Sequence, residues 1–196
     1  MHKNLPRVFI FLDEFKHEIF NKHNTNIGII YRNYKSLSRN REIFKIAKFC
    51  KEKRYKLFIS NDLKLALKVK ADGVYIPSFN KTHINVNNLG NKKLLIIGSA
   101  HNQSQIKNKI NQKCEAIFLS PIFPISKAKN HLGIHKFNLL SRQNNISIFA
   151  LGGINKNNFS KLKITKIEGF GGIGIFKKKP AYKRPVFLKN NFFYLN

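Results

Sequence analysis

The sequence predicts an α/β protein: a short (β/α)8 (TIM) barrel that forms a single domain over residues 1–196 and has a reduced last helix. Eight short β-branched or aromatic runs recur at intervals of roughly 20 to 30 residues, and most gaps between them carry helical periodicity. The runs are mostly apolar throughout, which is typical of parallel strands covered by helices. An open, doubly wound sheet is the alternative. However, no Gly-x-Gly-x-x-Gly pattern follows the first run, and there is no Walker-type loop.

The expected strands are built mainly from Ile, Val, Leu, Phe and Tyr, whose side chains suit a pleated surface. In chain order they cover 8–12, 27–31, 56–59, 73–76, 94–98, 116–119, 146–151 and 169–175.

The segment 40–54 is the clearest helix. Its apolar residues recur at a spacing of three or four, which places them on one stripe with charged residues elsewhere. Asn40 is the expected N-cap, because its side-chain oxygen can accept a hydrogen bond from the first turn. The expected stripe consists of Ile43, Phe44, Ala47 and Cys50.

The other gaps predict helices to different degrees. The segments are 61–70, 102–113 and 155–163, with weaker signals over 82–90 and 135–143. Asn61 or Asp62 can cap the first, and Asn155 can cap the third. In the second, Ile106 and Ile110 lie four residues apart on one face. Two prolines beyond the eighth strand leave room only for a stunted last helix.

The net charge of +28 has two explanations. A large basic excess is typical of proteins that bind nucleic acid or another polyanion. However, the chain holds 30 Lys, 25 Asn and 25 Ile, which share A/T-rich codons, and the lysines are spread over its whole length. We attribute the charge mainly to composition and do not expect nucleic acid as a partner. The charge would still draw small anions toward a concave site.

The sequence does not indicate a membrane or secreted protein. No apolar run reaches the ~18 residues of a membrane span, and the first residues hold about six apolar positions, fewer than a secretion signal needs. Cys50 and Cys114 lack metal-ligand spacing and lie in apolar segments, so both are expected to be reduced core residues. We expect a cytoplasmic protein without a membrane partner.

In such a barrel the active site lies at the carboxyl ends of the strands. Glycines follow the seventh strand (Gly152 and Gly153) and occur in the eighth (Gly172 and Gly174). Glycine lets backbone amides approach an oxyanion closely, and a helix that begins at Asn155 would add its dipole. We expect these loops to bind a phosphate; the alternative is that the glycines only permit tight turns.

Basic side chains follow the second and sixth strands and can converge on the same mouth, which suits a phosphate or pyrophosphate. They are Arg32, Lys35, Lys127 and Lys129. His101 follows the fifth strand, and we expect it to be a polar rim residue rather than a catalytic base.

Five segments carry a resemblance to a known family. They are Ser60-Asn61-Asp62 followed by LALKVKADGVYI, Gly98-Ser99-Ala100-His101, LSPIFP at 119–124, ALGGI at 150–154 and the glycine-rich eighth strand. Over residues 27–176 the chain resembles the thiamine phosphate synthase and thiazole tautomerase (TenI-like) family of small (β/α)8 barrels.

The resemblance implies a transferase of thiamine biosynthesis. The synthase displaces pyrophosphate from an aminopyrimidine-methyl pyrophosphate and puts the nitrogen of a thiazole phosphate in its place, through a carbocation-like transition state stabilised electrostatically. By resemblance Arg32 binds pyrophosphate and Ser99 contacts substrate. Lys127 and Lys129 lie in the family's Lys-bearing loop, and these four are the expected catalytic residues. The expected substrate- and phosphate-binding residues are Asn61, Gly152, Gly153, Gly172 and Gly174.

The resemblance also implies Mg²⁺, at a site that is degenerate in this chain. Asn61 and Asn80 stand where the family has acidic residues, and a hard cation prefers carboxylate oxygens. Asp62 is the remaining candidate ligand, and helix capping is an equally good explanation for it. The threonines that accompany the lysines of the family's loop are absent.

Three functions remain open. The first is a synthase-like transferase, in which lysines partly replace Mg²⁺. The second is a non-catalytic or tautomerase-like barrel that binds a thiazole phosphate or another phosphorylated ligand, and the third is a polyanion- or RNA-binding protein. Titration with both thiamine precursors separates the first two, and steeply salt-dependent RNA binding would favour the third. We also expect Gly153→Asp to abolish phosphate binding while the barrel stays folded, because the added carboxylate would face the oxyanion.

Overall fold

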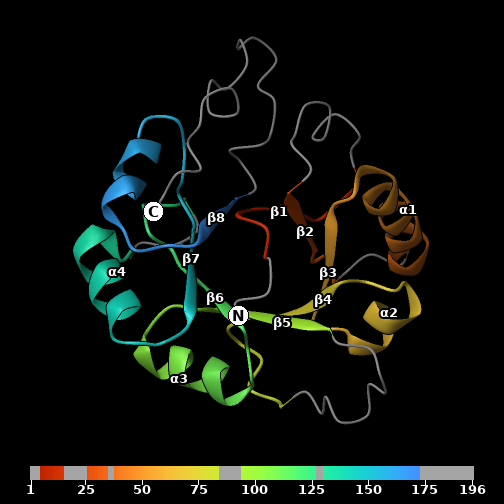
Figure 1. Cartoon of the computed structure of the whole chain (residues 1–196), viewed down its shortest axis with the longest axis horizontal. Helices are drawn as coiled ribbons and strands as arrows, with labels where there is room; N and C mark the ends of the chain where they lie inside the picture. Colours follow the sequence, from red (N-terminus) through yellow and green to blue (C-terminus); the bar gives the residue numbers. More distant parts are fainter. Residues whose placement is uncertain (1–4, 16–25, 35–37, 84–93, 127–129, 173–196) are drawn as a thin grey trace.

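Eight parallel strands form a closed barrel in the computed structural model of the chain (Figure 1). The structure describes residues 5–15, 26–34, 38–83, 94–126 and 130–172. Strands pair in chain order, and β8 closes the ring by pairing with β1. They are β1 (Val8–Leu12), β2 (Ile27–Tyr31), β3 (Lys56–Ser60), β4 (Gly73–Ile76), β5 (Leu95–Ala100), β6 (Ala116–Leu119), β7 (Ser147–Leu151) and β8 (Gly169–Gly172). The predicted barrel is confirmed.

Helices cover the outside of this barrel (Figure 1). They are α1 (Arg39–Lys53), α2 (Leu63–Lys68), α3 (Gln103–Asn111), α4 (Gly133–Arg142) and the 3-10 helix η3 (Phe159–Ile164). The helices expected over 40–54, 61–70 and 102–113 are confirmed, and the weak signal over 135–143 corresponds to a helix of ten residues. Most of the segment 82–90 and the stunted last helix lie outside the described residues.

The cap predicted for α1 is wrong, whereas one of the two caps predicted for α2 is confirmed. α1 begins after Ser38, which makes no side-chain cap hydrogen bond, so the expected cap at Asn40 is wrong. At α2, Asp62 rather than Asn61 is the cap, because its Oδ1 accepts from the backbone amide of Leu65 at 2.9 Å.

The buried face of α1 is rotated from the expected stripe. The helix buries Ile43, Ile46, Phe49 and Cys50, whereas Phe44 is 46% exposed. The Phe49 ring packs against Phe15 and Tyr55, at centroid distances of 5.4 and 6.1 Å. Phe15 and Tyr55 are not part of the helix, so the periodicity of the helix sequence could not reveal these contacts.

Phenylalanine rings fill the inside of the barrel. The Phe9 ring centroid lies 5.5, 5.1 and 5.3 Å from those of Phe58, Phe118 and Phe149. Glycine makes room for such rings: a Cβ on Gly171 would come within 2.9 Å of Phe118. This part of the glycine-rich eighth strand therefore serves core packing.

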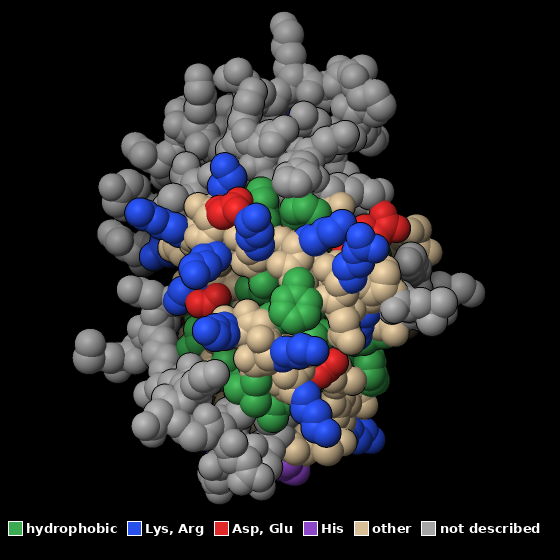
Figure 2. All heavy atoms as spheres, turned by 90° about the vertical axis from the view of Figure 1, so that its right-hand side faces the viewer, with side chains coloured by type: hydrophobic (Ala, Val, Ile, Leu, Met, Phe, Trp, Pro, Cys, Tyr) green, Lys and Arg blue, Asp and Glu red, His purple; other side chains and the backbone are tan. Residues whose placement is uncertain are grey.

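Cys50 and Cys114 are both free and buried, as predicted. Burial raises the pKa of each thiol to about 12, so neither is a reactive thiolate near neutral pH. On the face over α1 and α2, Lys and Arg side chains are scattered among polar and hydrophobic atoms (Figure 2). Among the described residues, no helix combines the length and the apolar character that a membrane span requires.

Candidate active site at the carboxyl end of the barrel

The carboxyl ends of the eight strands meet at one end of this closed parallel barrel. The predicted site residues Arg32, Asn61, Ser99 and Gly152 come from the ends of different strands and are brought to this mouth. The predicted residues outside the described part of the chain are Lys35, Lys127, Lys129 and Gly174.

Arg32 lies just beyond β2 and is paired with an acid. Its Nε donates to Asp13 Oδ1 at 2.9 Å, and a second guanidinium nitrogen donates to Asp13 Oδ2 at 3.3 Å. The guanidinium also lies 5.7 Å from the ring centroid of Phe11, at the top of the barrel core. The ion pair holds the Arg32 guanidinium in one orientation at the mouth. Asp13 therefore competes with any anion that would bind this guanidinium.

Ser99 is a buried residue of β5, and its side chain forms a hydrogen bond with the phenol of Tyr75 on β4. Burial raises the pKa of the Tyr75 phenol to about 12, and the Ser99 hydrogen bond and the Arg32 charge oppose that rise. Tyr75, Ser99 and Arg32 therefore form a polar layer between the phenylalanine core and the mouth.

The loops after β6 and β7 are locked together by backbone contacts. The amide of Ile122 donates to Leu151 O at 3.0 Å, and the amide of Phe123 donates to Gly152 O at 3.2 Å. The proline-rich stretch after β6, which begins with a cis bond before Pro121, thus continues the pairing with β7. Ile122 and Phe123 are buried, so this stretch is part of the core as well as of the mouth.

Gly152 and Gly153 have φ values of 91° and 72°, a left-handed region that favours glycine. A Cβ on Gly152 would come within 2.7 Å of Pro121, and one on Gly153 within 2.5 Å of Phe123 O. Tight packing therefore accounts for both glycines, and phosphate binding by their amides stays a prediction. Gly153→Asp would also destabilise the β6–β7 junction, because its side chain would collide with the backbone of the β6 loop; the expectation that the barrel stays folded in that variant stays a prediction.

Asn155 does not start a helix, so the expected helix dipole at this point is absent. Its Oδ1 accepts from the amide of Asn157 at 2.9 Å, while its own amide donates to Asn158 Oδ1 at 2.8 Å. The Asn158 side chain donates to Gly153 O at 2.8 Å. These bonds shape the loop after β7, and η3 begins only after Asn158.

Asn61 and Asn80, at the positions where the resemblance implies acidic ligands of Mg²⁺, are engaged in hydrogen bonds within the protein. The Asn80 side-chain nitrogen donates to Asn61 Oδ1, and Asn80 Oδ1 accepts from the amide of Thr82 at 2.7 Å. Asp62 Oδ1 is occupied by its helix cap. Within the described ranges, no group of three His, Cys, Asp or Glu side chains is placed to hold a metal ion. This donor set does not fit Mg²⁺, which prefers carboxylate oxygens.

His101 links the loops after β4, β5 and β6. Its Nδ1 lies 2.7 Å from the carbonyl oxygen of Ser120, which can only accept, so Nδ1 carries the proton. In the neutral ring Nε2 then accepts from the Ser78 hydroxyl, at 3.0 Å. The imidazole thus holds the rim of the mouth together.

Lys109 of α3 supports the loop after β4 from outside the barrel, and sequence reasoning missed it. It is 1% exposed, and its Nζ donates to Pro77 O, Asn80 O and Gln112 Oε1 at 2.7 to 2.8 Å. Burial lowers the pKa of its ammonium to about 8. A Cβ on Gly98 of β5 would come within 2.8 Å of the lysine stem. Two features of the sequence could have indicated a buried lysine here. Lys109 lies three residues after Ile106, on the buried face of α3, and β5 has a glycine, Gly98, opposite it.

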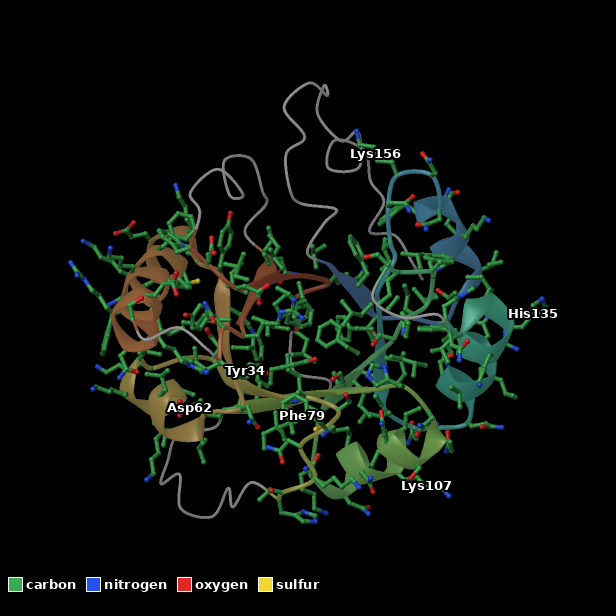
Figure 3. The ribbon with its side chains drawn as sticks, turned by 180° about the vertical axis from the view of Figure 1, so that it is seen from behind. Tyr34, Asp62, Phe79, Lys107, His135 and Lys156 are labelled. Atoms are coloured by element: carbon green, nitrogen blue, oxygen red, sulfur yellow. The ribbon has the colours of Figure 1, made fainter. Side chains whose placement is uncertain are left out.

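Tyr34, Arg39 and Phe79 were also missed as a group. The Arg39 guanidinium donates to Ser60 O at 2.9 Å and lies 5.5 Å from the Tyr34 ring centroid. The Tyr34 and Phe79 rings are in contact, at a centroid distance of 6.2 Å (Figure 3). Because these residues lie on three separate segments, no local pattern could join them.

Comparison with known proteins identifies similar chains. A family model described as thiamine monophosphate synthase matches residues 26–174. A thiamine-phosphate synthase of Prochlorococcus marinus subsp. pastoris is 35% identical over 138 residues, which is 68% of this chain and 39% of the relative. A putative thiamine-phosphate synthase 2 of Aquifex aeolicus is 32% identical over 141 residues, 69% of this chain and 74% of the relative. The chain spans well under half the length of the Prochlorococcus relatives.

The fold has a solved counterpart as well. Thiamine phosphate pyrophosphorylase from Pyrococcus furiosus superposes with a TM-score of 0.71 and 21% identity, covering 87% of each chain. At that identity the likeness supports the barrel fold alone.

Proposed function

The chain belongs to the thiamine monophosphate synthase family, and from this premise we propose that it joins an aminopyrimidine-methyl pyrophosphate to a thiazole phosphate. The observation that carries the proposal is the family match over 26–174, which includes all of β2–β8. The motif residues Arg32, Asn61 and Ser99 all come from strand ends at one mouth.

In the proposed reaction the carbon–oxygen bond to pyrophosphate breaks, and the pyrophosphate leaves with the electron pair. The thiazole nitrogen then forms the new bond to the methylene carbon. Arg32, together with Lys127 and Lys129, would bind the departing pyrophosphate, and fixed positive charge favours this step because negative charge develops on the leaving group. Ser99 would contact the pyrophosphate substrate.

The thiazole phosphate would bind at the loops after β7 and β8. Backbone amides at Gly152 and Gly153 are the proposed donors to its phosphate, together with the glycines at 172 and 174. Because the amides of Asn61 and Asn80 do not suit Mg²⁺, we assign the pyrophosphate charge to the basic side chains and derive no step from the metal.

The direct test incubates the purified chain with both precursors and measures thiamine phosphate, with added Mg²⁺ and with a chelator. We expect product in both conditions, and loss of product in Arg32→Gln. Binding of the thiazole phosphate without any product would contradict the transferase and favour a binding barrel. If neither precursor binds, the small-molecule assignment itself fails.

A further inference from the structure

Two aromatic side chains stand exposed at the barrel mouth. Tyr34 follows β2 and is 44% exposed, and Phe79 follows β4 and is 67% exposed. Their rings meet at an interplanar angle of 76°, so they form a corner between the two loops (Figure 3). Adjoining apolar surface of this kind at a mouth marks a ligand-binding position more often than single exposed residues do.

A buried ammonium holds the turn that presents Phe79. The amide of Asn80 donates to Pro77 O at 3.1 Å, which closes the turn around Phe79. Lys109 Nζ donates to the same Pro77 carbonyl and to the Asn80 carbonyl, at 2.8 and 2.7 Å. The backbone that carries the Phe79 ring is therefore held in place. Binding of a ligand to the ring would cost little entropy for ordering this turn.

Contacts around the corner form a closed circuit. The Tyr34 hydroxyl is hydrogen-bonded to the Ser60 hydroxyl, and Ser60 is followed by Asn61. Asn61 accepts from the Asn80 side chain, Asn80 follows Phe79, and the Phe79 ring returns to Tyr34. Three strand ends thus hold two rings and one amide pair in a single arrangement.

The side-chain amide of Asn61, beside the two rings, has hydrogen-bonding groups that the described part of the protein does not use. In the described part of the chain, the side-chain nitrogen of Asn61 has no protein partner, and its oxygen uses one of two lone pairs. An amide with one donor and one acceptor matches a ring nitrogen beside an exocyclic amino group, as in the pairing of Asn with adenine. Asn61 has a φ of 58°, a left-handed conformation that asparagine tolerates better than most residues, and the hydrogen bond from Asn80 restrains its side chain.

We propose that Phe79 and Tyr34 stack a planar nitrogen heterocycle and that the Asn61 amide reads its edge, so that this corner binds the aminopyrimidine ring. The proposal rests on the proposed function for the identity of the ring, and on the structure for its position. It assigns the residues that determine specificity for the aromatic half of the pyrophosphate substrate.

The test is isothermal titration with the aminopyrimidine alcohol, which lacks phosphate, and separately with the thiazole phosphate. Phe79→Ala removes the ring, and Phe79→Leu keeps apolar volume without an aromatic face. Phe44→Ala is the matched control, because Phe44 is a comparably exposed phenylalanine on α1. We expect both Phe79 variants to bind the alcohol about tenfold more weakly and the thiazole phosphate unchanged, with the control unaffected.

The outcomes separate this inference from the proposed function. Unchanged affinity for the alcohol in Phe79→Leu overturns the stacking corner, even if thiamine phosphate is still made. If Phe79→Ala loses both ligands because its turn collapses, Phe79→Leu decides alone. If the wild-type chain binds neither ligand, the proposed function fails first and the corner loses its assigned ring.

Discussion

The side-chain amide of Asn80 donates a hydrogen bond to the side-chain oxygen of Asn61, across the ends of β4 and β3. The bond is a neutral contact between two positions where the resemblance to the family implies acidic residues. It needs no metal, whereas two carboxylates so placed would repel each other and be stabilised by a divalent cation.

The double variant Asn61→Asp with Asn80→Asp should therefore gain Mg²⁺ affinity. We expect at least a tenfold tighter apparent Kd than in the wild-type chain, measured by titration with magnesium chloride. Asn111→Asp, at the exposed end of α3, shows the effect of one negative charge added away from these positions. Equal Mg²⁺ affinity in the double variant and the wild type would show that these positions do not face a common cation site.

The ion pair between Arg32 and Asp13 predicts a variant with a gain in binding. Asp13→Asn removes the charge that occupies the guanidinium fork, so Arg32 becomes available to an anion. We expect inorganic pyrophosphate to bind several-fold more tightly, with an effect that shrinks as salt is added. Glu52→Gln changes the net charge equally at an exposed position of α1 and should have little effect. Weaker binding in Asp13→Asn would mean that Asp13 orients Arg32 rather than competing for it.

Much of the fold was readable from the sequence because buried parallel strands carry their signal locally. Runs such as Val8–Leu12 and Ala116–Leu119 begin and end where apolarity predicts. The face of α1 was harder, since the burial of Phe49 depends on rings outside the helix. The cap at Asn155 failed for a different reason: Asn155 and Asn158 accept from backbone amides within one loop, and the helix begins only after the second of them.

The position of a candidate site residue was predictable only where the residue lies at or directly after the end of a strand. Arg32 and Asn61 follow strands and Ser99 is the residue before the last of β5, and the barrel places every strand end at one mouth. Lys109 reaches the loop after β4 from α3, and Arg39 reaches the end of β3 from the start of α1. Neither could be placed without knowing how far those side chains extend over the strands.

Two glycines with positive φ give a matched test of packing at the β6–β7 junction. Gly153→Ala would place a Cβ within 2.5 Å of a backbone oxygen, whereas a Cβ on Gly133 would meet nothing within 4 Å. Both substitutions carry the left-handed strain of about 1–2 kcal/mol. Only Gly153→Ala adds a collision that the backbone must relieve, at a further ~1–3 kcal/mol. Thermal unfolding should rank Gly153→Ala well below Gly133→Ala, and equal Tm values would contradict the tight contact.

The buried Lys109 predicts how stability changes with pH. Its pKa is about 8 in the folded chain, below the unfolded value of about 10.4. Below pH 8 both states hold the proton, and the folded state bears the cost of burying the ammonium. Between pH 8 and 10.4 the folded state releases the proton while the unfolded state keeps it, so the Lys109 contribution to stability rises with pH.

Lys109→Met removes this titration and nearly preserves the side-chain volume. The free energy of unfolding of the wild type minus that of the variant should rise by on the order of 2 kcal/mol between pH 8 and 10. Cys50 and Cys114, with thiol pKa values raised to about 12, lose stabilising contributions above pH 9. Both are present in both chains, so their effects largely cancel in the difference. Lys107→Met, an exposed lysine on the same helix, should give a difference that is flat with pH. A flat difference for Lys109→Met as well would mean that the ammonium stays charged in its site.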